Sequence, residues 1–318
     1  MKVYVKTPAR LHLGLIDLNG DLGRLFGGLG VAIDHPNVTL ESEISTELTV
    51  TGKGTELTRK FASQFLETNK IERKVAIKVE QNIPAHVGLG SGTQLALAVA
   101  TSISKLFGVE GSAQEFAAIL SRTAQSGVGT AVFAEGGLVV DAGKNTLDPS
   151  KKVIPVICRI PFPDEWRFVV AIPNTQKGLA NEAETTAFRK LPQMPQIEVG
   201  KICRLTMLKL LPSIPEHDIE SFGAALTDIQ RIVGDAFANA QGGRFASTPA
   251  GQCIEFMLKS GVYGAGQSSW GPTVYGIVKN NEAKETCSQL QTFLKEGVGG
   301  EVFIAKANNS GATIKTIK

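Results

Sequence analysis

The most informative segment of the chain is IPAHVGLGSGTQ, residues 83–94. Before it, Val75, Ile77 and Val79 alternate as in a half-buried strand, and after it the apolar residues of 95–106 recur at helical spacing. Alternate glycines lack Cβ atoms, so the backbone can turn tightly and bring several N–H groups close to an anion. Because the first turn of a helix carries unpaired N–H donors, the order strand, glycine loop, helix predicts a phosphate site.

The glycine-rich half of this loop supplies the predicted phosphate-binding residues. An isolated GxGxG pattern is also compatible with a simple strand-to-helix turn, in which Ser91 or Thr93 is only the N-cap. The phosphate interpretation gains weight from two further segments of the same chain. The candidates in this loop are Gly88, Leu89, Gly90, Ser91, Gly92, Thr93 and Gln94.

A second candidate cluster lies in residues 8–17, PARLHLGLID, and extends to Arg24. Arg10, His12 and Asp17 stand among apolar residues directly after a predicted strand, where an uncompensated charge is costly and needs partners. A functional cluster accounts for this pattern. The alternative is that Arg10 and Asp17 merely pair with each other and that His12 is a satisfied core residue.

The third segment is GAGQSSWGPT, residues 264–273, which the pattern predicts to be a second glycine-rich loop ahead of a strand. Its hydroxyl, amide and indole groups are candidates for substrate binding, and a large aromatic among glycines can form a flat wall for a ring-bearing ligand. The alternative is that the tryptophan only fills the interface between two lobes. The candidates are Gln267, Ser268, Ser269 and Trp270.

Length and composition predict a globular protein of two lobes. The 318 residues exceed one ordinary domain of about 150 residues, and 42% are hydrophobic and 20% charged. Four prolines between 149 and 163 interrupt a stretch of weak periodicity, so we divide the chain into lobes 1–160 and 161–318. The predicted strands are 2–6, 75–79, 138–140, 273–278 and 301–305, and the predicted helices are 95–106, 113–124, 219–240 and 282–295.

Charge and cysteine usage exclude several function classes. The formal net charge of +3 is small and the cationic residues are scattered, which argues against a nucleic-acid partner. The four cysteines lie far apart, with neither zinc-site nor disulfide-framework spacing. The N-terminus turns polar after five residues, and no apolar run approaches the roughly 20 residues of a membrane helix. We therefore expect a cytoplasmic enzyme without a membrane partner.

Three motifs follow one another in the chain: a PxR motif at residues 8–10, the GLGSG loop that opens a helix, and the glycine-rich segment 264–273. In this order they resemble the motifs of the GHMP superfamily of small-molecule kinases. That resemblance implies an α+β fold in which a ribosomal-protein-S5-domain-2-like N-terminal lobe, containing a left-handed βαβ unit, joins a ferredoxin-like C-terminal lobe. The longer strings at residues 8–33, 84–100 and 264–276 are similar to one branch, the β-ribofuranosylaminobenzene 5′-phosphate synthases.

The branch implies a specific reaction and set of partners. Its members condense phosphoribosyl diphosphate with 4-aminobenzoate or 4-hydroxybenzoate, releasing carbon dioxide and diphosphate, in the pathway to methanopterin-type folate analogues. On this resemblance we expect Mg²⁺ to bridge the diphosphate oxygens, and the protein to form a homodimer. Arg10 and Arg24 are the expected anion clamps, and His12 or Asp17 is expected to activate the para group of the benzoate.

Two departures from these patterns bear on function. GHMP kinases usually carry SGxDxAV, whose Asp can act as base, whereas this chain has SGVGTAV at residues 126–132, with Gly129 in the Asp position. This argues against the main alternative, an ATP-dependent small-molecule kinase. A non-enzymatic sensor of a phosphorylated metabolite is a further alternative, and the retained charged residues argue against it. Phe26 stands where the synthases often have an Asp before the paired glycines.

Overall fold

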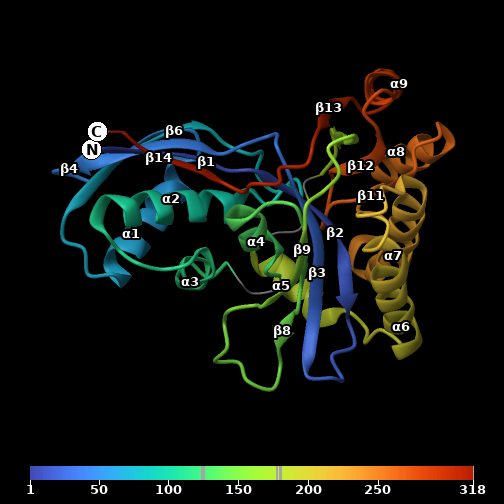
Figure 1. Cartoon of the computed structure of the whole chain (residues 1–318), viewed down its shortest axis with the longest axis horizontal. Helices are drawn as coiled ribbons and strands as arrows, with labels where there is room; N and C mark the ends of the chain where they lie inside the picture. The colour runs from blue at the N-terminus through green and yellow to red at the C-terminus, as the bar shows by residue number, and fades with distance from the viewer. Residues whose placement is uncertain (123–125, 177, 179–180, 318) are drawn as a thin grey trace.

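The chain folds into two α/β halves with a further sheet running between them (Figure 1). The computed structural model describes residues 1–122, 126–176, 178 and 181–317, with the backbone alone at 181–185. Helices and strands are mixed along the chain, which confirms the predicted α+β class. Among the residues that the structure describes, no helix combines the length and the apolar character needed to cross a lipid bilayer.

The sheet of the first half contains both ends of the chain. Its strands are, in spatial order, β14 (Thr313–Ile317), β1 (Lys2–Lys6), β4 (Thr39–Ser45), β6 (Lys74–Gln81) and β5 (Thr49–Gly52). Val3 and Val5 are fully buried while Lys2 and Lys6 are exposed, so the alternation seen in the sequence is confirmed. β5 pairs in parallel with β6, and the intervening helix α1 (Thr55–Thr68) completes a βαβ unit.

Helix α2 (Ser91–Phe107) forms the centre of the first half. It packs on β1 and β4 and is enclosed by α1, α3 (Ala113–Ile119) and α4 (Val128–Ala134). Side chains from Gln94 to Ser104 are all buried, as predicted for a core helix. The helix begins after Gly90, which adopts a left-handed conformation with φ 77°. α3 ends at Ile119, with Leu120 as its C-cap, and is therefore shorter than predicted. Residues 123 and 124 of that prediction lie outside the described residues.

The sheet between the two halves carries the second candidate cluster. It consists of β2 (Ala9–Asp17), β3 (Arg24–Ile33), β7 (Leu138–Asp141) and β9 (Val156–Ile160), with β8 (Lys144–Asn145) paired to β3. β7 confirms the short strand predicted at 138–140. The pairing of β2 with β3 shifts between His12 and Gly14, which marks a β-bulge beside the candidate residues.

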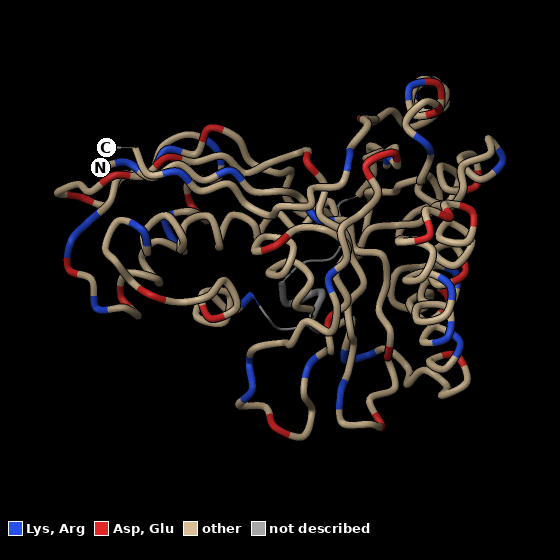
Figure 2. The backbone as a smooth tube through the Cα atoms, viewed as in Figure 1, with Lys and Arg blue, Asp and Glu red and all other residues tan. Residues whose placement is uncertain are grey.

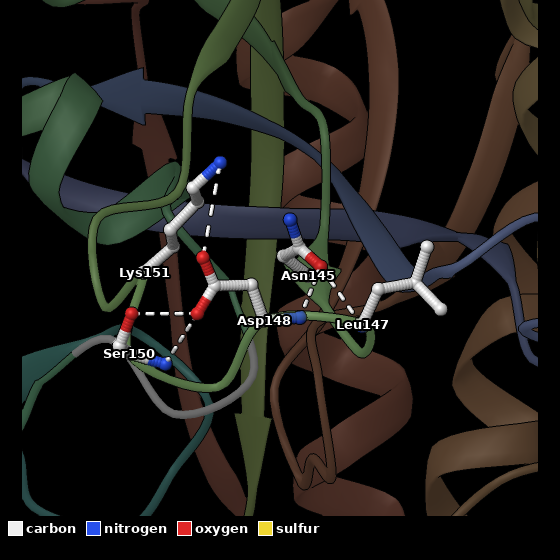
Figure 3. Close-up of polar contacts among 5 residues, drawn as sticks. All are labelled: Asn145, Leu147, Asp148, Ser150 and Lys151. Atoms are coloured by element: carbon white, nitrogen blue, oxygen red, sulfur yellow. Dashed lines mark hydrogen bonds and ion pairs between the residues drawn. The ribbon is translucent and has the colours of Figure 1, made fainter.

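The loop after β8 is held by its own side chains (Figure 3). Asn145 Oδ1 accepts hydrogen bonds from the backbone N–H groups of Leu147 and Asp148, both at 2.9 Å. Asp148 Oδ1 accepts in turn from the hydroxyl and the backbone N–H of Ser150. These turns fix the loop beside the tip of the β2–β3 hairpin, where Thr146 N–H donates to Gly23 O at 3.0 Å.

The second half has the strand order of a ferredoxin-like fold. Its sheet is β11 (Gly264–Gln267), β12 (Val274–Lys279), β10 (Trp166–Pro173) and β13 (Gly300–Ala305), so the strands lie in the order 2-3-1-4 along the chain of this half. The helices are α5 (Asn181–Lys190), α6 (Gln196–Leu205), the π-helix η1 (Thr206–Leu210), α7 (Ile219–Gln241), α8 (Thr248–Lys259) and α9 (Ala283–Glu296). The strands and helices predicted after residue 218 are confirmed, with ends that differ by a residue or two.

The two faces of this second sheet pack against different helices. Val169 and Ala171 of β10 join a core with α8 and α9, while Phe168 and Val170 belong to the main core with Phe222 of α7. The long helix α7 therefore lies on the side of the sheet that faces the first half, and contacts β2 directly. This contact brings residues of both halves to one place.

Two features differ from the sequence prediction. Residues 264–267 form strand β11 and not a loop, and the connecting turn is confined to 268–273. In addition, the chain crosses back at its end, because β14 pairs with β1 over five residue pairs from Lys2↔Ile317 to Lys6↔Thr313. The range 161–318 thus contains one strand of the first half's sheet, while the boundary at residue 160 remains a prediction.

Candidate active site

A cavity of about 630 Å³ lies where the glycine loop, β2, α7 and the turn after β11 meet. This volume is ample for small-molecule substrates. Both halves of the chain line it, with Arg10 and Gly90 from the first and Phe237 and Trp270 from the second. The three sequence segments selected as candidates therefore converge on one site.

The glycine loop presents the start of α2 to the cavity. Gly88, Gly90, Ser91, Gly92 and Thr93 line it, as expected for the phosphate loop. Two of the predicted residues do not line it. The Leu89 side chain is fully buried in the core, and Gln94 is buried with its Nε2 donating to Gly129 O at 2.7 Å.

Arg10 lies against this loop from the side of β2. Its Nη1 donates to Gly88 O at 3.2 Å, and a Cβ atom at Gly90 would lie 3.5 Å from its Nε. Its backbone N–H donates to Leu89 O at 3.1 Å, so the strand and the loop are joined. The guanidinium is therefore held at the N-terminal end of α2, where an anion is already favoured by the helix dipole.

Ser268 joins the turn after β11 to the glycine loop that precedes α2. Its hydroxyl donates to Gly88 O at 2.6 Å and accepts from the backbone N–H of His12 at 2.9 Å. A Cβ at Gly88, which has φ 92°, would collide with Ser268 O. Gly88 is thus needed for the packing of loop on loop. Ser268 itself is fully buried and does not line the cavity, so its predicted contact with substrate is replaced by a supporting role.

His12 is a neutral imidazole at the cavity wall. It is 7% exposed, and burial, followed by the positive charge of Arg10, holds the pKa of its imidazole well below the ordinary value of 6.5. A neutral imidazole can accept a proton or a hydrogen bond at physiological pH. The functional interpretation of His12 therefore agrees with its position and its protonation state.

Asp17 and Arg24, also predicted in the site, do not line this cavity, and their roles in the reaction remain predictions. Asp17 Oδ1 accepts hydrogen bonds from the backbone N–H groups of Asn19 at 2.6 Å and Gly20 at 2.9 Å, and so shapes the turn after β2. Arg24 is exposed on β3, and its Nη1 donates to Gly143 O at 3.1 Å. Both residues organise the hairpin that carries Arg10 and His12.

Aromatic side chains form the opposite wall. Trp270 is 4% exposed and meets Phe237 edge-to-face at 4.8 Å and Phe188 at 5.3 Å between ring centroids. All three line the cavity. Phe26, with φ 81°, packs edge-to-face behind Phe188 at 5.0 Å. The hydrophobic residue at position 26 therefore extends this aromatic wall, and Trp270 both closes the interface and faces the cavity.

Amide side chains of the second half fix the floor of the cavity. Gln230 Nε2 donates to Leu13 O at 2.7 Å, and its Oε1 accepts from the backbone N–H of Gln267 at 2.8 Å. Gln267 Oε1 accepts from Ala246 N–H at 2.7 Å, and its Nε2 donates to Ser269 O at 2.9 Å. Of the residues predicted in this segment, Gln267, Ser269 and Trp270 line the cavity.

The sequence did not indicate several residues that the structure brings to the cavity. Arg122 follows α3 without a recognisable motif. The helical spacing of apolar residues in α7 predicts only that they face the core, although one edge of that apolar face lines the cavity. A Ser before a helix could have indicated Ser126. The residues concerned are His86, Ser121, Arg122, Ser126, Phe188, Gln230, Val233, Phe237, Gln241, Arg244 and Phe245.

The described lining is electropositive. It includes Arg10, Arg122 and Arg244 and no Asp or Glu, although Arg244 also pairs with Asp235 outside the lining, with Nε 2.6 Å from Oδ1. Over the chain as a whole, Lys and Arg alternate with Asp and Glu (Figure 2). The cationic character is therefore local to the cavity and suits a substrate with phosphate or carboxylate groups.

A side chain at the usual position of the kinase base would fit tightly. A Cβ at Gly129 would lie 3.1 Å from Thr93 Cγ2, within the contact between α4 and α2. Asp141 fixes the start of α4 nearby, because its Oδ2 accepts from the N–H groups of Gly127 at 2.8 Å and Val128 at 3.1 Å. A side chain at Gly129 would therefore require Thr93 to shift by a few tenths of an ångström.

Comparison with known proteins agrees with the architecture. The chain matches the family of GHMP kinases N terminal domain over residues 56–137 and that of GHMP kinases C terminal over residues 210–296. It is similar to the homoserine kinase of Cytophaga hutchinsonii, with a TM-score of 0.72 and 18% identity over 99% of this chain and 97% of that one. At this identity the likeness concerns the fold alone.

Two curated relatives are more similar in sequence. The β-ribofuranosylphenol 5′-phosphate synthase of Archaeoglobus fulgidus is 36% identical, covering 98% of this chain and 99% of the relative. The protein of the same name from Methanothermobacter thermautotrophicus is 33% identical, covering 98% of each chain. The similarity therefore extends over both halves of the fold and all three segments of the cavity.

Proposed function

Because the chain belongs to the family of β-ribofuranosylphenol 5′-phosphate synthases, on the GHMP kinase fold, we propose that it joins phosphoribosyl diphosphate to a para-substituted benzoate. The acceptor is 4-hydroxybenzoate or 4-aminobenzoate, and carbon dioxide and diphosphate are released. One observation carries this proposal: a single cavity has an arginine-flanked helix N-terminus on one wall and an aromatic cluster on another.

The diphosphate is expected at the start of α2. Breaking the bond between the anomeric carbon and the diphosphate leaves positive charge on the ribose and negative charge on the leaving group. The N–H donors of the glycine loop and the guanidinium of Arg10 offset that negative charge as it develops. A preorganised cationic end of the cavity thus favours departure of the diphosphate.

The benzoate ring is expected against Trp270, Phe188 and Phe237. Its carboxyl-bearing carbon attacks the anomeric carbon, and the electron pair of the ring–carboxylate bond then returns to the ring as carbon dioxide leaves. An apolar wall excludes water, which would otherwise capture the reactive ribose carbon. Trp270 is only 4% exposed, so it contributes a sealed apolar part of this wall and presents little of its indole to the ring.

His12 is our candidate for activating the para group. A para hydroxyl that donates a hydrogen bond to the neutral imidazole releases more electron density into the ring, and the hydroxyl keeps its proton while carbon dioxide leaves. The lowered pKa of His12 keeps the imidazole unprotonated for this purpose. Removing such a group typically lowers the rate by about 10² to 10⁴, so His12→Gln is expected to lower kcat far more than it raises the KM for phosphoribosyl diphosphate.

Mg²⁺ is proposed to enter with the diphosphate. No cluster of three metal-ligating side chains occurs in the part of the chain that the structure describes, and the described lining contains no carboxylate. These residues therefore do not fit a metal ion held by the protein alone. The hydroxyls of Ser91 and Thr93 are the lining groups that could contact an ion carried by diphosphate oxygens.

The main competing function is ATP-dependent phosphorylation of a small alcohol. Its usual base is missing, because Gly129 has no side chain, and a Cβ there would press on Thr93. We also propose that the enzyme acts in the cytoplasm. We further propose that it forms a homodimer, and light scattering of the purified protein would measure this oligomeric state.

The test is carbon dioxide release from carboxyl-labelled 4-hydroxybenzoate and 4-aminobenzoate, each with Mg²⁺ and phosphoribosyl diphosphate. We expect release that requires both substrates, in equal amount to the diphosphate formed. Folded protein that releases no label from either acid, but consumes ATP in the presence of an alcohol, would support the kinase instead.

A further inference from the structure

Arg122 is a cationic residue of the cavity to which the reaction described above gives no role. We propose that Arg122 is a second clamp for the substrate diphosphate, at the first turn of α2 and next to the position that Arg10 contacts. This inference rests on the proposed function. Arg122 lies between α3 and α4, outside the three segments that carry the family resemblance.

The backbone at the end of α3 fixes where Arg122 starts. Ser121 N–H donates to Ala118 O at 3.1 Å and Arg122 N–H donates to Ala117 O at 2.7 Å. Ser121 adopts φ 56°, so this is a Schellman motif with a non-glycine residue in the left-handed position. That conformation is unfavourable for serine, and it turns the chain so that both Ser121 and Arg122 line the cavity.

The side chain of Arg122 reaches the first turn of α2. A Cβ at Gly92 would lie 3.0 Å from its Nη2 and 3.5 Å from its Cζ. Arg10 approaches the same turn at Gly90, two residues earlier. Gly90 is the left-handed residue just before α2, and Gly92 is the second residue of the helix. The two arginine side chains therefore reach the helix start at two neighbouring positions.

This arrangement fits two phosphoryl groups better than one. The start of α2 offers N–H donors at its centre, and each guanidinium fork can donate two hydrogen bonds to one phosphoryl group. The aromatic wall comes from different elements, α5, α7 and the turn after β11, so the ring does not compete for the same place. Of the anionic groups in the two substrates, the diphosphate is the one that this pair of arginines matches.

Arg122→Met tests the clamp by calorimetry with inorganic diphosphate at a fixed Mg²⁺ concentration, and with orthophosphate for comparison. We expect diphosphate binding about 10- to 100-fold weaker, as for loss of one charge-assisted partner, and a smaller loss for orthophosphate. In turnover, the KM for phosphoribosyl diphosphate should rise by a similar factor, while the KM for the benzoate changes little. The matched control is Arg231→Met on α7, an exposed arginine paired with Asp228 outside the cavity, which should change neither value.

Gly92→Ala provides a second test that does not remove a charge. The added methyl group must displace the flexible end of Arg122 by a few tenths of an ångström, so diphosphate binding should weaken several-fold. Alanine is also the better residue inside a helix, so the Tm should stay equal or rise. Gly200→Ala in α6 has open space around its Cβ and should show the same effect on Tm without any change in binding.

The outcomes separate this inference from the proposed reaction. If wild-type protein binds diphosphate but makes no product, the reaction assignment fails, and the two variants still decide the role of Arg122. If folded Arg122→Met and Gly92→Ala bind diphosphate as the wild type does, Arg122 is not a clamp. Wild-type protein that binds no diphosphate at all would overturn the inference as well.

Discussion

At the scale of single residues, the most unusual group in the site is His12. It is buried in β2 beside Arg10, and both burial and the neighbouring charge lower the pKa of its imidazole below 6.5. The unfolded chain, by contrast, exposes an ordinary histidine. Between the lowered pKa and 6.5, the unfolded state therefore binds a proton that the folded state does not.

This difference predicts a pH dependence of stability. The free energy of unfolding should rise with pH below 6.5, with His12 contributing up to about 1.4 kcal/mol per pH unit, and should level off above 6.5. His12→Gln should lose that contribution. Urea unfolding of both proteins between pH 5 and 8 measures it, and parallel curves for wild type and variant would show that His12 is not buried as a neutral group.

Gly129 gives a second prediction at this scale. Gly129→Asp should not restore a kinase base, because its Cβ would press on Thr93 and its carboxylate would be buried in the contact between α4 and α2. We expect a loss of about 2–4 kcal/mol in the free energy of unfolding and no ATP-dependent phosphorylation. Gly129→Ala separates the two causes, since it retains only the steric part. A stable Gly129→Asp protein with kinase activity would contradict the account.

The residues of the site could be predicted from the sequence only in part. Arg10 and His12, which line the cavity, were selected because charged groups among apolar residues need partners. The same reasoning selected Asp17, whose carboxylate shapes the turn after β2. Arg24 was selected as an anion clamp, and it donates to Gly143 O outside the cavity. The bulge between His12 and Gly14 interrupts the alternation of β2, so counting along the strand does not give the residues that face the cavity. The contact between Arg122 and α2 could not be predicted from the sequence, because it depends on how α3 packs.

At the scale of elements, the site depends on two glycine loops packed backbone against backbone. Gly88 meets Ser268 O, and Ser268 in turn joins Gly88 O to the backbone of His12. Glycines that look like phosphate-loop residues in the sequence therefore have two different tasks. Gly90 and Gly92 leave room for arginines, whereas Gly88 leaves room for the other loop.

Gly88→Ala should consequently destabilise the whole protein and not only ligand binding. We expect a loss of about 2–4 kcal/mol in the free energy of unfolding, from its left-handed φ together with the collision. Gly242→Ala is the matched control, because Gly242 has φ 79° but nothing within 4 Å of its Cβ, and it should lose only about 1 kcal/mol. Chemical denaturation measures both, and equal losses would mean that the loops do not need their close contact.

Strand β11 shows why one element was predicted wrongly. Gly264 and Gly266 indicate a loop by composition, but their missing side chains let β11 approach α7, where a Cβ would meet Gly223 or Gln230. Gly223 of α7 likewise leaves room for the backbone of Tyr263. Glycines can mark a close approach of two elements as well as a turn, and the sequence pattern does not distinguish the two cases.

At the scale of the whole molecule, the order of the three motifs was enough to predict the fold, because the family resemblance covers both halves. The return of the C-terminus to the first sheet was not predicted, since residues 313–317 have no buried face to produce a strong strand pattern. The segment between β13 and β14 is held by two contacts. Asn309 Oδ1 accepts a hydrogen bond from Phe162 N–H at 2.8 Å, and Ala307 forms an isolated β-bridge with Ile33.

This return predicts the effect of removing residues 313–318. The truncated protein would lose the ladder between β14, whose own residues are exposed, and β1. β1 would become an open edge, so we expect a Tm lower by a few degrees and concentration-dependent aggregation. Turnover well below the Tm should be unchanged, because none of the described residues 313–317 lines the cavity. Loss of activity in truncated protein that is still folded would show that the C-terminal strand influences the site.

The central claim is that this cavity forms a carbon–carbon bond between its two substrates, and the product itself tests it most directly. Phosphoribosyl diphosphate labelled with ¹³C at the anomeric carbon, incubated with Mg²⁺ and ring-labelled 4-hydroxybenzoate, should give a product in which one-bond coupling joins the two labelled carbons, with the carboxyl carbon lost. A product that retains the carboxyl group and joins the ribose through oxygen, with no such coupling, would contradict the account.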